Sequence, residues 1–431
     1  MRPTAIPKGV QVLPPTETAR LRWVQRTLLT IFHRWGFREI LTPTFEYLEV
    51  FEGEGQATDH GEICKFVDRE TGQLLALRPD LTPQVARMVA TTLRHHPLPL
   101  RLAYSVPVFR HAEAHGGRAR EFFQAGVELC GLARPEADAE MIAMAVEGCQ
   151  AVGLKNFQID VGQVEYLRGI LQAIDPPEAL HREVLSALRR KDPAALELLV
   201  KPLAVPDPLK EALLSLTDLY GGEEVLDRAE RQAPTNASKA ALANIRQVTA
   251  VLKTYGLAEH IIIDLGEAYA FNYHTGVVFQ IFTESLGRPI GGGGRYDNLI
   301  GNFGEPCPAT GFAFELEGVL EALESQGTLP PDRGPDFHII DFHQDKRQAL
   351  EIARTLRAAG YAVSRDIIQR DLDGSLAYAK FSAIPHTIIL GAPGQPEGTL
   401  LLREVTSGRE TSYPIPAFCR QVTQGELRWP T

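Results

Sequence analysis

The sequence predicts an α+β protein, and three patterns along its 431 residues lead to this prediction. Polar positions alternate in 124–128 at the period of a strand with one polar face. Residues 165–255 are rich in Leu, Ala, Glu, Lys and Arg, a composition that favours helices. Beyond residue 335, apolar runs alternate with helical patterns, which is typical of a small α/β domain. We therefore expect a core, a helical insertion and a C-terminal α/β domain.

The core is expected to begin with a helix followed by a strand. Apolar side chains recur at helical spacing through 17–35, and Gly36 is a typical residue just beyond a helix end. Residues 37–43 then have a strand pattern that a proline terminates. Farther along, we expect a helix at 136–152 and a strand at 156–162.

Glycines and prolines indicate the domain boundaries. The segment 326–335, QGTLPPDRGP, is the clearest linker in the chain. We therefore place the core at 1–325, with its helical insertion at about 165–255, and the last domain at 336–431. In that domain we expect strands at 337–342, 361–364 and 387–390, and helices at 345–359 and 372–380.

Composition and charge limit the classes of function. The formal net charge of −10 argues mildly against a broad RNA-binding face. The five cysteines are widely spaced and form no C-x-x-C pair, so we expect reduced thiols in a cytoplasmic protein. The segment from His111 to His115 is not an H-E-x-x-H motif, and no metal or cofactor is expected. Because residues 1–15 lack the apolar core of a secretory signal and no run of about 18 apolar residues occurs, no membrane association is expected.

A candidate binding surface lies on the strand at 124–128. Gln124, Gly126 and Glu128 occupy every second position, so they share one face. A carboxylate and an amide on one wall suit a ligand with N–H donors, such as an ammonium and an imidazole. Spacing alone equally fits a polar strand face that meets water. Asp80 and Thr82 follow Pro79 and are expected to begin a helix, where capping is the alternative role.

The region Val108 to Gly131 resembles the central motif of the class II aminoacyl-tRNA synthetases. It has Phe109-Arg110, then Gly-Arg at 117–118, Arg-Glu-Phe at 120–122, and the Gln-x-Gly-x-Glu strand. Three further regions resemble histidyl-tRNA synthetases and, more closely, their paralogue, the regulatory subunit of the short-form ATP phosphoribosyltransferase. These regions are 77–87, 268–279, and 291–299 together with 308–320. The resemblance implies an antiparallel sheet core, and a C-terminal domain similar to the anticodon-binding domain of the synthetases.

The same resemblance implies a site for histidine. Asp80 and Thr82 match the residues that hold the α-amino group, and Tyr296 matches a tyrosine that closes the pocket. In the signature at 268–279, Tyr273 matches the first tyrosine and His274 replaces the second. The implied histidine-binding residues are Asp80, Thr82, Arg110, Gln124, Glu128, Tyr273, His274 and Tyr296. No catalytic residue is implied.

Three departures from the synthetase pattern affect the nucleotide. Ala112 replaces the glutamate that reads adenine, and Tyr269 and Gly318 replace two arginines that contact phosphates. Glu315 stands where the third class II motif has a glycine. Each lost group is commonly worth about 3 kcal/mol in the transition state, so we expect adenylation to fall by many orders of magnitude.

The resemblance therefore implies a non-catalytic subunit that binds histidine for feedback control and activates a short catalytic subunit in histidine biosynthesis. It also implies a homodimer formed through the class II core, and tRNA is not an expected partner. One alternative is histidyl-tRNA synthetase itself, which the C-terminal domain favours. The other is a free-standing paralogue that binds histidine or RNA and has a different partner.

Overall fold

This computed structural model describes residues 5–52, 60–111, 119–267, 274–331, 334–368 and 370–426. The chain divides into two compact units, residues 1–329 and 330–431, and the division falls inside the glycine- and proline-rich segment 326–335. Each unit has its own hydrophobic core. The binding surface expected from the sequence lies in the first unit.

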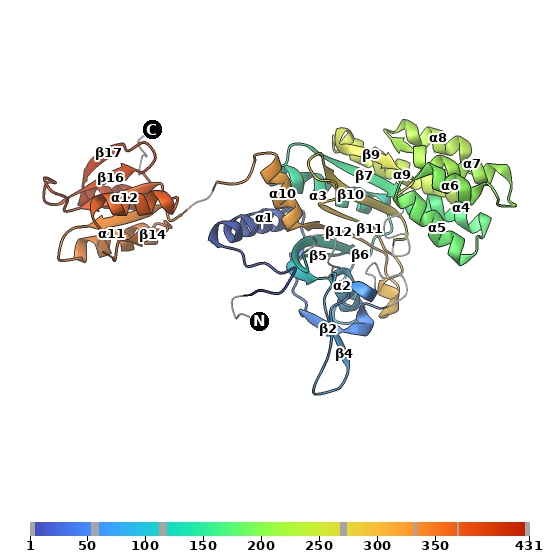
Figure 1. Cartoon of the computed structure of the whole chain (residues 1–431), viewed down its shortest axis with the longest axis horizontal. Coiled ribbons are helices and arrows are strands. Elements are labelled where there is room, and N and C mark those ends of the chain that lie inside the picture. Colours follow the sequence, from blue (N-terminus) through green and yellow to red (C-terminus); the bar gives the residue numbers. More distant parts are fainter. Residues whose placement is uncertain are drawn as a thin grey trace. The chain divides into compact units, whose positions relative to one another are not determined.

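The first unit is built on a mixed sheet of nine strands within the described residues, in the order β1-β5-β6-β12-β11-β10-β7-β9-β8 (Figure 1). Its centre, from β5 to β7, is antiparallel throughout, whereas β1 on β5 and β9 on β7 are parallel. The fold is α+β, as predicted. The strands are β1 (Arg38–Glu39), β5 (Leu100–Phe109), β6 (Glu121–Cys130), β7 (Phe157–Gln163), β8 (Tyr220–Gly221), β9 (Ile261–Asp264), β10 (Val277–Thr283), β11 (Gly291–Arg295) and β12 (Ala309–Glu315).

The two faces of this sheet are covered differently. Helices α1 (Pro15–Arg34), α3 (Pro135–Ala151) and α10 (Leu316–Ser325) pack on one face, against side chains such as Val127 and Phe312. Helix α2 (Thr82–Ala90) lies on the other face with Tyr104 and Tyr296 (Figure 1). Since neighbouring residues of a strand face opposite sides, the odd-numbered Ala125, Val127 and Leu129 are in the helical core, and Gln124 and Glu128 face α2.

Two sequence expectations for this region differ in extent from the structure. The strand expected at 37–43 is only Arg38–Glu39, because it pairs with β5 over two residues. Beside α2 lies a three-stranded sheet that the sequence did not indicate. Its strands are β2 (Phe45–Tyr47), β3 (Lys65–Val67) and β4 (Leu74–Leu77). Short 3-10 helices occupy Leu48–Val50, His60–Glu62, Leu216–Asp218, Ala258–His260 and Ile300–Asn302.

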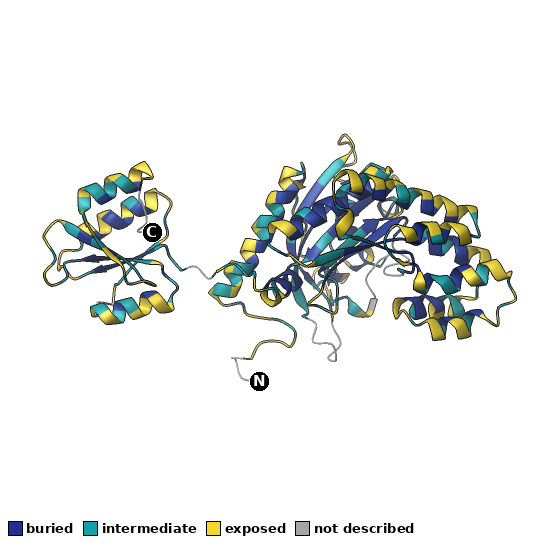
Figure 2. Cartoon of the chain, turned by 90° about the horizontal axis from the view of Figure 1, so that it is seen from above, coloured by how far each residue is buried: buried dark blue, intermediate teal, exposed yellow. Residues whose placement is uncertain are grey.

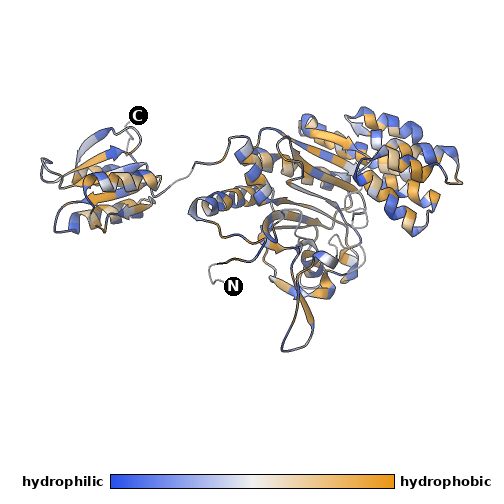
Figure 3. Ribbon diagram, viewed as in Figure 1, coloured by the Kyte–Doolittle hydropathy of each residue, from blue (hydrophilic) through white to orange (hydrophobic). Residues whose placement is uncertain are grey.

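The helical insertion follows β7 and packs its helices around a buried apolar interior. Figure 2 shows the buried residues in the sheet and on the inward helix faces, and Figure 3 shows hydrophilic residues on the outward faces. Gln163 caps the first helix by accepting the N–H of Glu165. The helices are α4 (Val164–Ile174), α5 (Glu178–Arg189), α6 (Pro193–Val200), α7 (Asp207–Ser215), α8 (Glu224–Gln232) and α9 (Asn236–Thr254).

An ion pair holds the insertion to the sheet, and its removal should be measurable. Lys191 Nζ lies 2.5 Å from Asp264 Oδ2 in β9, and the Asp264 side chain is only 3% exposed. We expect Lys191→Ala to lower the free energy of unfolding by about 2 kcal/mol, because the buried Asp264 carboxylate would lose its partner. The loss is moderate because the Lys191 side chain is half-exposed, so its removal lets water reach the carboxylate. Urea unfolding measures this effect. The matched change Lys201→Ala, in an exposed pair with Glu197, should cost under about 1 kcal/mol, and equal losses would contradict the assignment.

The second unit is a five-stranded sheet in the order β14-β13-β15-β16-β17 within the described residues, with the first three strands parallel. Helices and strands occur where the sequence predicts them up to residue 390, and the sequence analysis missed the last three elements. The elements are β13 (Phe337–Asp341), α11 (Arg347–Ala358), β14 (Val363–Arg365), α12 (Leu372–Phe381), β15 (His386–Leu390), β16 (Thr399–Glu404), β17 (Glu410–Pro414) and α13 (Ile415–Gln424).

Candidate functional site

A cavity of about 120 Å³ lies on the α2 face of the main sheet. The structure brings seven of the eight sequence-predicted site residues to its lining, and the eighth, Tyr273, lies outside the described residues. Ligand pockets for drug-sized molecules are commonly about 300–1,000 Å³, so this volume suits a ligand as small as one amino acid. The lining residues that the sequence predicted are Asp80, Thr82, Arg110, Gln124, Glu128, His274 and Tyr296.

Strand register assembles the cavity floor. Across β6 and β12, Glu128 faces Gly311 and Gln124 faces Glu315, and across β12 and β11, Gly311 faces Gly294. A Cβ at Gly311 would overlap the Glu128 carboxylate, and a Cβ at Gly294 would lie 2.8 Å from the His274 ring. The carboxylate and the imidazole therefore rest on neighbouring glycines, where no other residue type leaves room for them.

Glu128 is buried beneath three hydroxyl groups. Thr82 Oγ1 donates to Glu128 Oε1 at 2.7 Å, Tyr296 donates to Oε2, and Tyr104 lies 3.4 Å from Oε1. Burial raises the pKa of Glu128 to about 8, with a smaller contribution from the charge of Asp80, although the hydroxyl hydrogen bonds oppose the shift. The carboxyl is therefore largely neutral at pH 7, and a ligand that offers N–H donors or positive charge favours its ionised form.

The two residues expected to hold the ligand's α-amino group, Asp80 and Thr82, lie at the start of α2, and Gln124 lies on β6. Asp80 Oδ1 accepts the N–H of Leu81 at 2.7 Å, just before α2 begins at Thr82. The Thr82 hydroxyl makes its hydrogen bond to Glu128 and does not cap the helix. Gln124 Oε1 is buried and has no hydrogen-bond partner among the described residues. Since buried polar groups are nearly always satisfied, this acceptor indicates a ligand donor.

Arg110 is the single arginine or lysine among the described lining residues, which also include three acidic side chains. Its Nε donates to the carbonyl oxygen of Pro79 at 3.0 Å, and its guanidinium lies 5.1 Å from the ring centroid of Phe122. The guanidinium is thus held between Pro79, which precedes α2, and Phe122 of β6, where it can meet a ligand carboxylate.

An ion-pair network occupies the end of the cavity near Glu315. Arg288 Nη1 lies 3.3 Å from Glu315, and its Nη2 lies 2.6 Å from Glu321. A Cβ at Gly318 would lie 3.1 Å from Arg288 Nη1, so Arg288 uses space that a larger residue at 318 would need. Beside it, Glu317 accepts the N–H of Phe123, and burial raises the pKa of Glu317 to about 7. Acidic groups therefore outnumber cations among these residues, a charge balance that disfavours phosphate groups.

Sequence reasoning missed three groups at this site. Tyr104 lies opposite Gly126, and a Cβ at Gly126 would be 2.7 Å from the Tyr104 hydroxyl. Gln280, opposite Gly292, also lines the cavity. The third is Arg288, and none of the three belongs to a motif. Ala112 and Tyr269, on which part of the nucleotide argument depends, lie outside the described residues.

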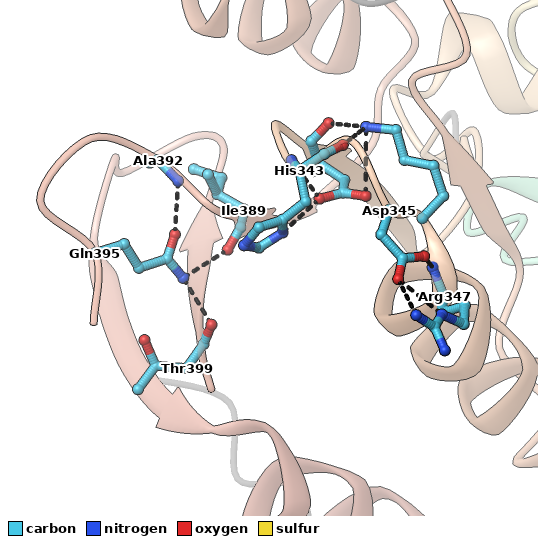
Figure 4. Close-up of polar contacts among 9 residues, drawn as sticks. His343, Asp345, Arg347, Ile389, Ala392, Gln395 and Thr399 are labelled. Atoms are coloured by element: carbon cyan, nitrogen blue, oxygen red, sulfur yellow. Dashed lines mark hydrogen bonds and ion pairs between the residues drawn. The ribbon is translucent and has the colours of Figure 1, made fainter. Parts of the chain in front are cut away.

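The second unit has a polar cluster at the ends of β13 and β15 (Figure 4). His343 Nδ1 lies 2.9 Å from Asp341 Oδ1, and Lys346 Nζ donates to the Asp341 carbonyl oxygen at 2.8 Å. Nearby, the Gln395 side chain bonds Ile389, Ala392 and Thr399 and closes its own loop. These contacts stabilise two loops.

In the described part of the chain, no group of three or more His, Cys, Asp or Glu side chains could hold a metal ion. Among the same residues, no helix has the length and the apolar composition of a membrane-spanning helix.

The fold and the cavity together define a class II aminoacyl-tRNA synthetase-like protein of the histidyl type. Residues 9–319 match the family model described as histidyl-tRNA synthetase. The crystal structure of an ATP phosphoribosyltransferase regulatory subunit/histidyl-tRNA synthetase from Bacillus halodurans is similar, with a TM-score of 0.80 and 31% identity, over 90% of this chain and 99% of that one.

Similar proteins with assigned names show which family within this class the chain belongs to. The ATP phosphoribosyltransferase regulatory subunit of Syntrophotalea carbinolica is 42% identical over 98% of this chain and 97% of its own. The histidine–tRNA ligase of Thermococcus kodakarensis is 36% identical over 94% of this chain and 95% of its own. The chain belongs to the family of ATP phosphoribosyltransferase regulatory subunits.

Proposed function

We propose that this chain is the non-catalytic regulatory subunit of ATP phosphoribosyltransferase, the enzyme that joins ATP and phosphoribosyl pyrophosphate in the first step of histidine biosynthesis. It binds histidine in the cavity for feedback control and activates a short catalytic subunit in the cytoplasm. The observation that carries the proposal is that one cavity is lined by both the buried Glu128 carboxyl and the unsatisfied Gln124 oxygen. Family membership supports the same role.

Histidine has the donors and charges that the cavity requires. Its imidazole N–H would donate to Glu128, and its ammonium would meet Asp80 and the Gln124 oxygen. Its carboxylate is left for Arg110, because a planar guanidinium matches the geometry of a carboxylate. Tyr273 is proposed to contact the imidazole ring of histidine, and it is the eighth proposed binding residue.

The proposed subunit acts through contacts with other chains. The chain forms a homodimer through its class II core and a hetero-oligomer with the short catalytic subunit. It is not expected to bind tRNA. Linkage then requires histidine in the cavity to change the catalytic partner's substrate affinity or turnover. Reconstitution of a short catalytic chain tests this. The activity of the catalytic chain should depend on this chain and fall when histidine is added. Activity that is changed by neither would contradict the proposal.

Restoring one arginine should not restore amino-acid activation. We expect Gly318→Arg to leave histidine-dependent exchange of pyrophosphate into ATP at background, because the new side chain would displace Arg288 and Glu315 would remain beside it. Exchange catalysed by an authentic histidyl-tRNA synthetase, measured in parallel, is the positive control. Exchange above background in the wild type would contradict the non-catalytic assignment.

Histidyl-tRNA synthetase is the second candidate function. The α/β second unit favours it, since such a domain resembles the anticodon-binding domain, and so does the 36% identical histidine–tRNA ligase. The same exchange assay distinguishes the two candidates. A synthetase would form histidyl adenylate and charge tRNA, whereas a regulatory subunit would do neither.

A further inference from the structure

The helical insertion contacts the cavity wall through its first helix. Arg168 Nη2, in α4, donates to the carbonyl oxygen of His274 at 2.9 Å, and Val164 N donates to the carbonyl oxygen of Gly276 at 3.0 Å. His274 lines the cavity and is 4% exposed. A residue of the cavity wall is therefore held through its own main chain by the insertion.

The same short segment is bonded to the strand end that carries Tyr296. Thr275 N donates to the Arg295 carbonyl oxygen at 2.8 Å, and Asp297 N donates to Thr275 Oγ1 at 2.8 Å. Tyr296, between those two residues, donates to Glu128. A shift of Glu128 and Tyr296 on ligand binding would thus act on residues 274–276 from one side, and α4 holds them from the other.

Helix α4 is packed too closely on α9 to move alone. A Cβ at Gly169 would lie 3.0 Å from the side chains of Ala237 and Ser238 in α9. Gln163, the cap of α4, donates to Asn244 Oδ1 of α9 at 2.8 Å. Because tightly packed helices shift together, a displacement of α4 is passed to α9.

We infer that the helical insertion senses occupancy of the cavity, and that Arg168 is the positioning residue that couples His274 to α4. The inference rests on the proposed function, because it takes histidine as the ligand. An ion pair with Glu165, one turn earlier, fixes the Arg168 guanidinium to its own helix. Linkage is reciprocal, so if histidine stabilises α4, loss of the Arg168 hydrogen bond lowers histidine affinity by the same factor.

Hydrogen exchange of the full chain, with and without saturating histidine, tests the coupling. In the wild type, histidine should slow amide exchange in α4 and α9 by about fivefold, the lower end of common coupling factors. In Arg168→Ala this slowing should disappear, and calorimetric affinity should fall by about the same factor. Arg168→Lys keeps a donor and should restore part of both effects. Arg182→Ala, in an exposed pair with Glu178 on α5, should match the wild type.

Two results would overturn the inference. One is equal histidine protection of α4 in Arg168→Ala and the wild type. The other is histidine binding to the wild type with no protection of α4. If Arg168→Ala does not fold, Arg168→Lys decides. Histidine protection of α4 and histidine affinity that both fall in part would support the coupling, whereas lost protection without a change in affinity, or no change in either, would contradict it. A wild type that binds no histidine would contradict the proposed function itself.

Discussion

Glu128→Gln is expected to stabilise the empty protein at pH 9 and to weaken histidine binding. The folded-state pKa of Glu128 is raised from 4.5 to about 8, chiefly by burial. Stability from the protonated carboxyl is therefore fully present below pH 4.5 and is lost as pH rises through 8. A shift of this size corresponds to roughly 5 kcal/mol at most. A neutral amide avoids the loss but needs a new acceptor, so we expect a gain on the order of 2 kcal/mol.

Urea unfolding between pH 5 and 9 measures this difference. The variant and the wild type should have similar stability at pH 5 and diverge toward pH 9. Glu211→Gln, an exposed change in α7, is the control and should not alter the pH dependence. An unchanged pH dependence in Glu128→Gln would show that Glu128 is ionised in the empty cavity.

Histidine affinity should change in the opposite direction to stability. Loss of a charged hydrogen-bond acceptor should weaken binding by roughly 1.5–3 kcal/mol. At pH 7 the wild type should release a proton on binding, because ligand donors favour ionised Glu128, whereas the variant has no such proton. Calorimetry in buffers of different ionisation enthalpy measures both quantities. Unchanged affinity in Glu128→Gln would remove this residue from the proposed site.

Gly311→Ala is expected to abolish histidine binding and to destabilise the core by about 3 kcal/mol. The added Cβ would overlap both the Glu128 carboxylate and the carbonyl oxygen of Val127 in the neighbouring strand. Overpacking of a sheet core costs roughly 1–3 kcal/mol, and here the backbone itself must give way. Calorimetry on protein shown to be folded by circular dichroism measures the loss of binding.

Gly287→Ala is the matched control, because no atom lies within 4 Å of the Cβ it would add. Its histidine affinity and its stability should equal those of the wild type within experimental error. Wild-type affinity in folded Gly311→Ala would mean that the ligand does not use the Glu128 end of the cavity.

The sequence predicted those parts of the site that are local in the chain. Period-two spacing was enough to place Gln124 and Glu128 on one face, and Pro79 was enough to place Thr82 at a helix start. Family motifs supplied Arg110, His274 and Tyr296, which the structure brings to the same cavity. The proposed contacts with histidine are untested predictions.

The parts that the sequence did not predict depend on register between distant strands and on packing. Tyr104 enters the cavity because β5 pairs with β6 so that it faces a glycine. Arg288 belongs to no motif that the sequence analysis identified. Its guanidinium pairs with Glu315 in space that a side chain at residue 318 would need. In the same way, Thr82 has the pattern of a helix cap, but the buried carboxyl is its hydrogen-bond partner.

The central claim is that the cavity binds an imidazole amino acid and no longer holds a nucleotide. Calorimetric titration of the full chain with histidine, followed by ATP and magnesium, tests it most directly. We expect saturable binding of one histidine per cavity and no heat from ATP. Saturable ATP binding that strengthens when histidine is present would contradict the claim.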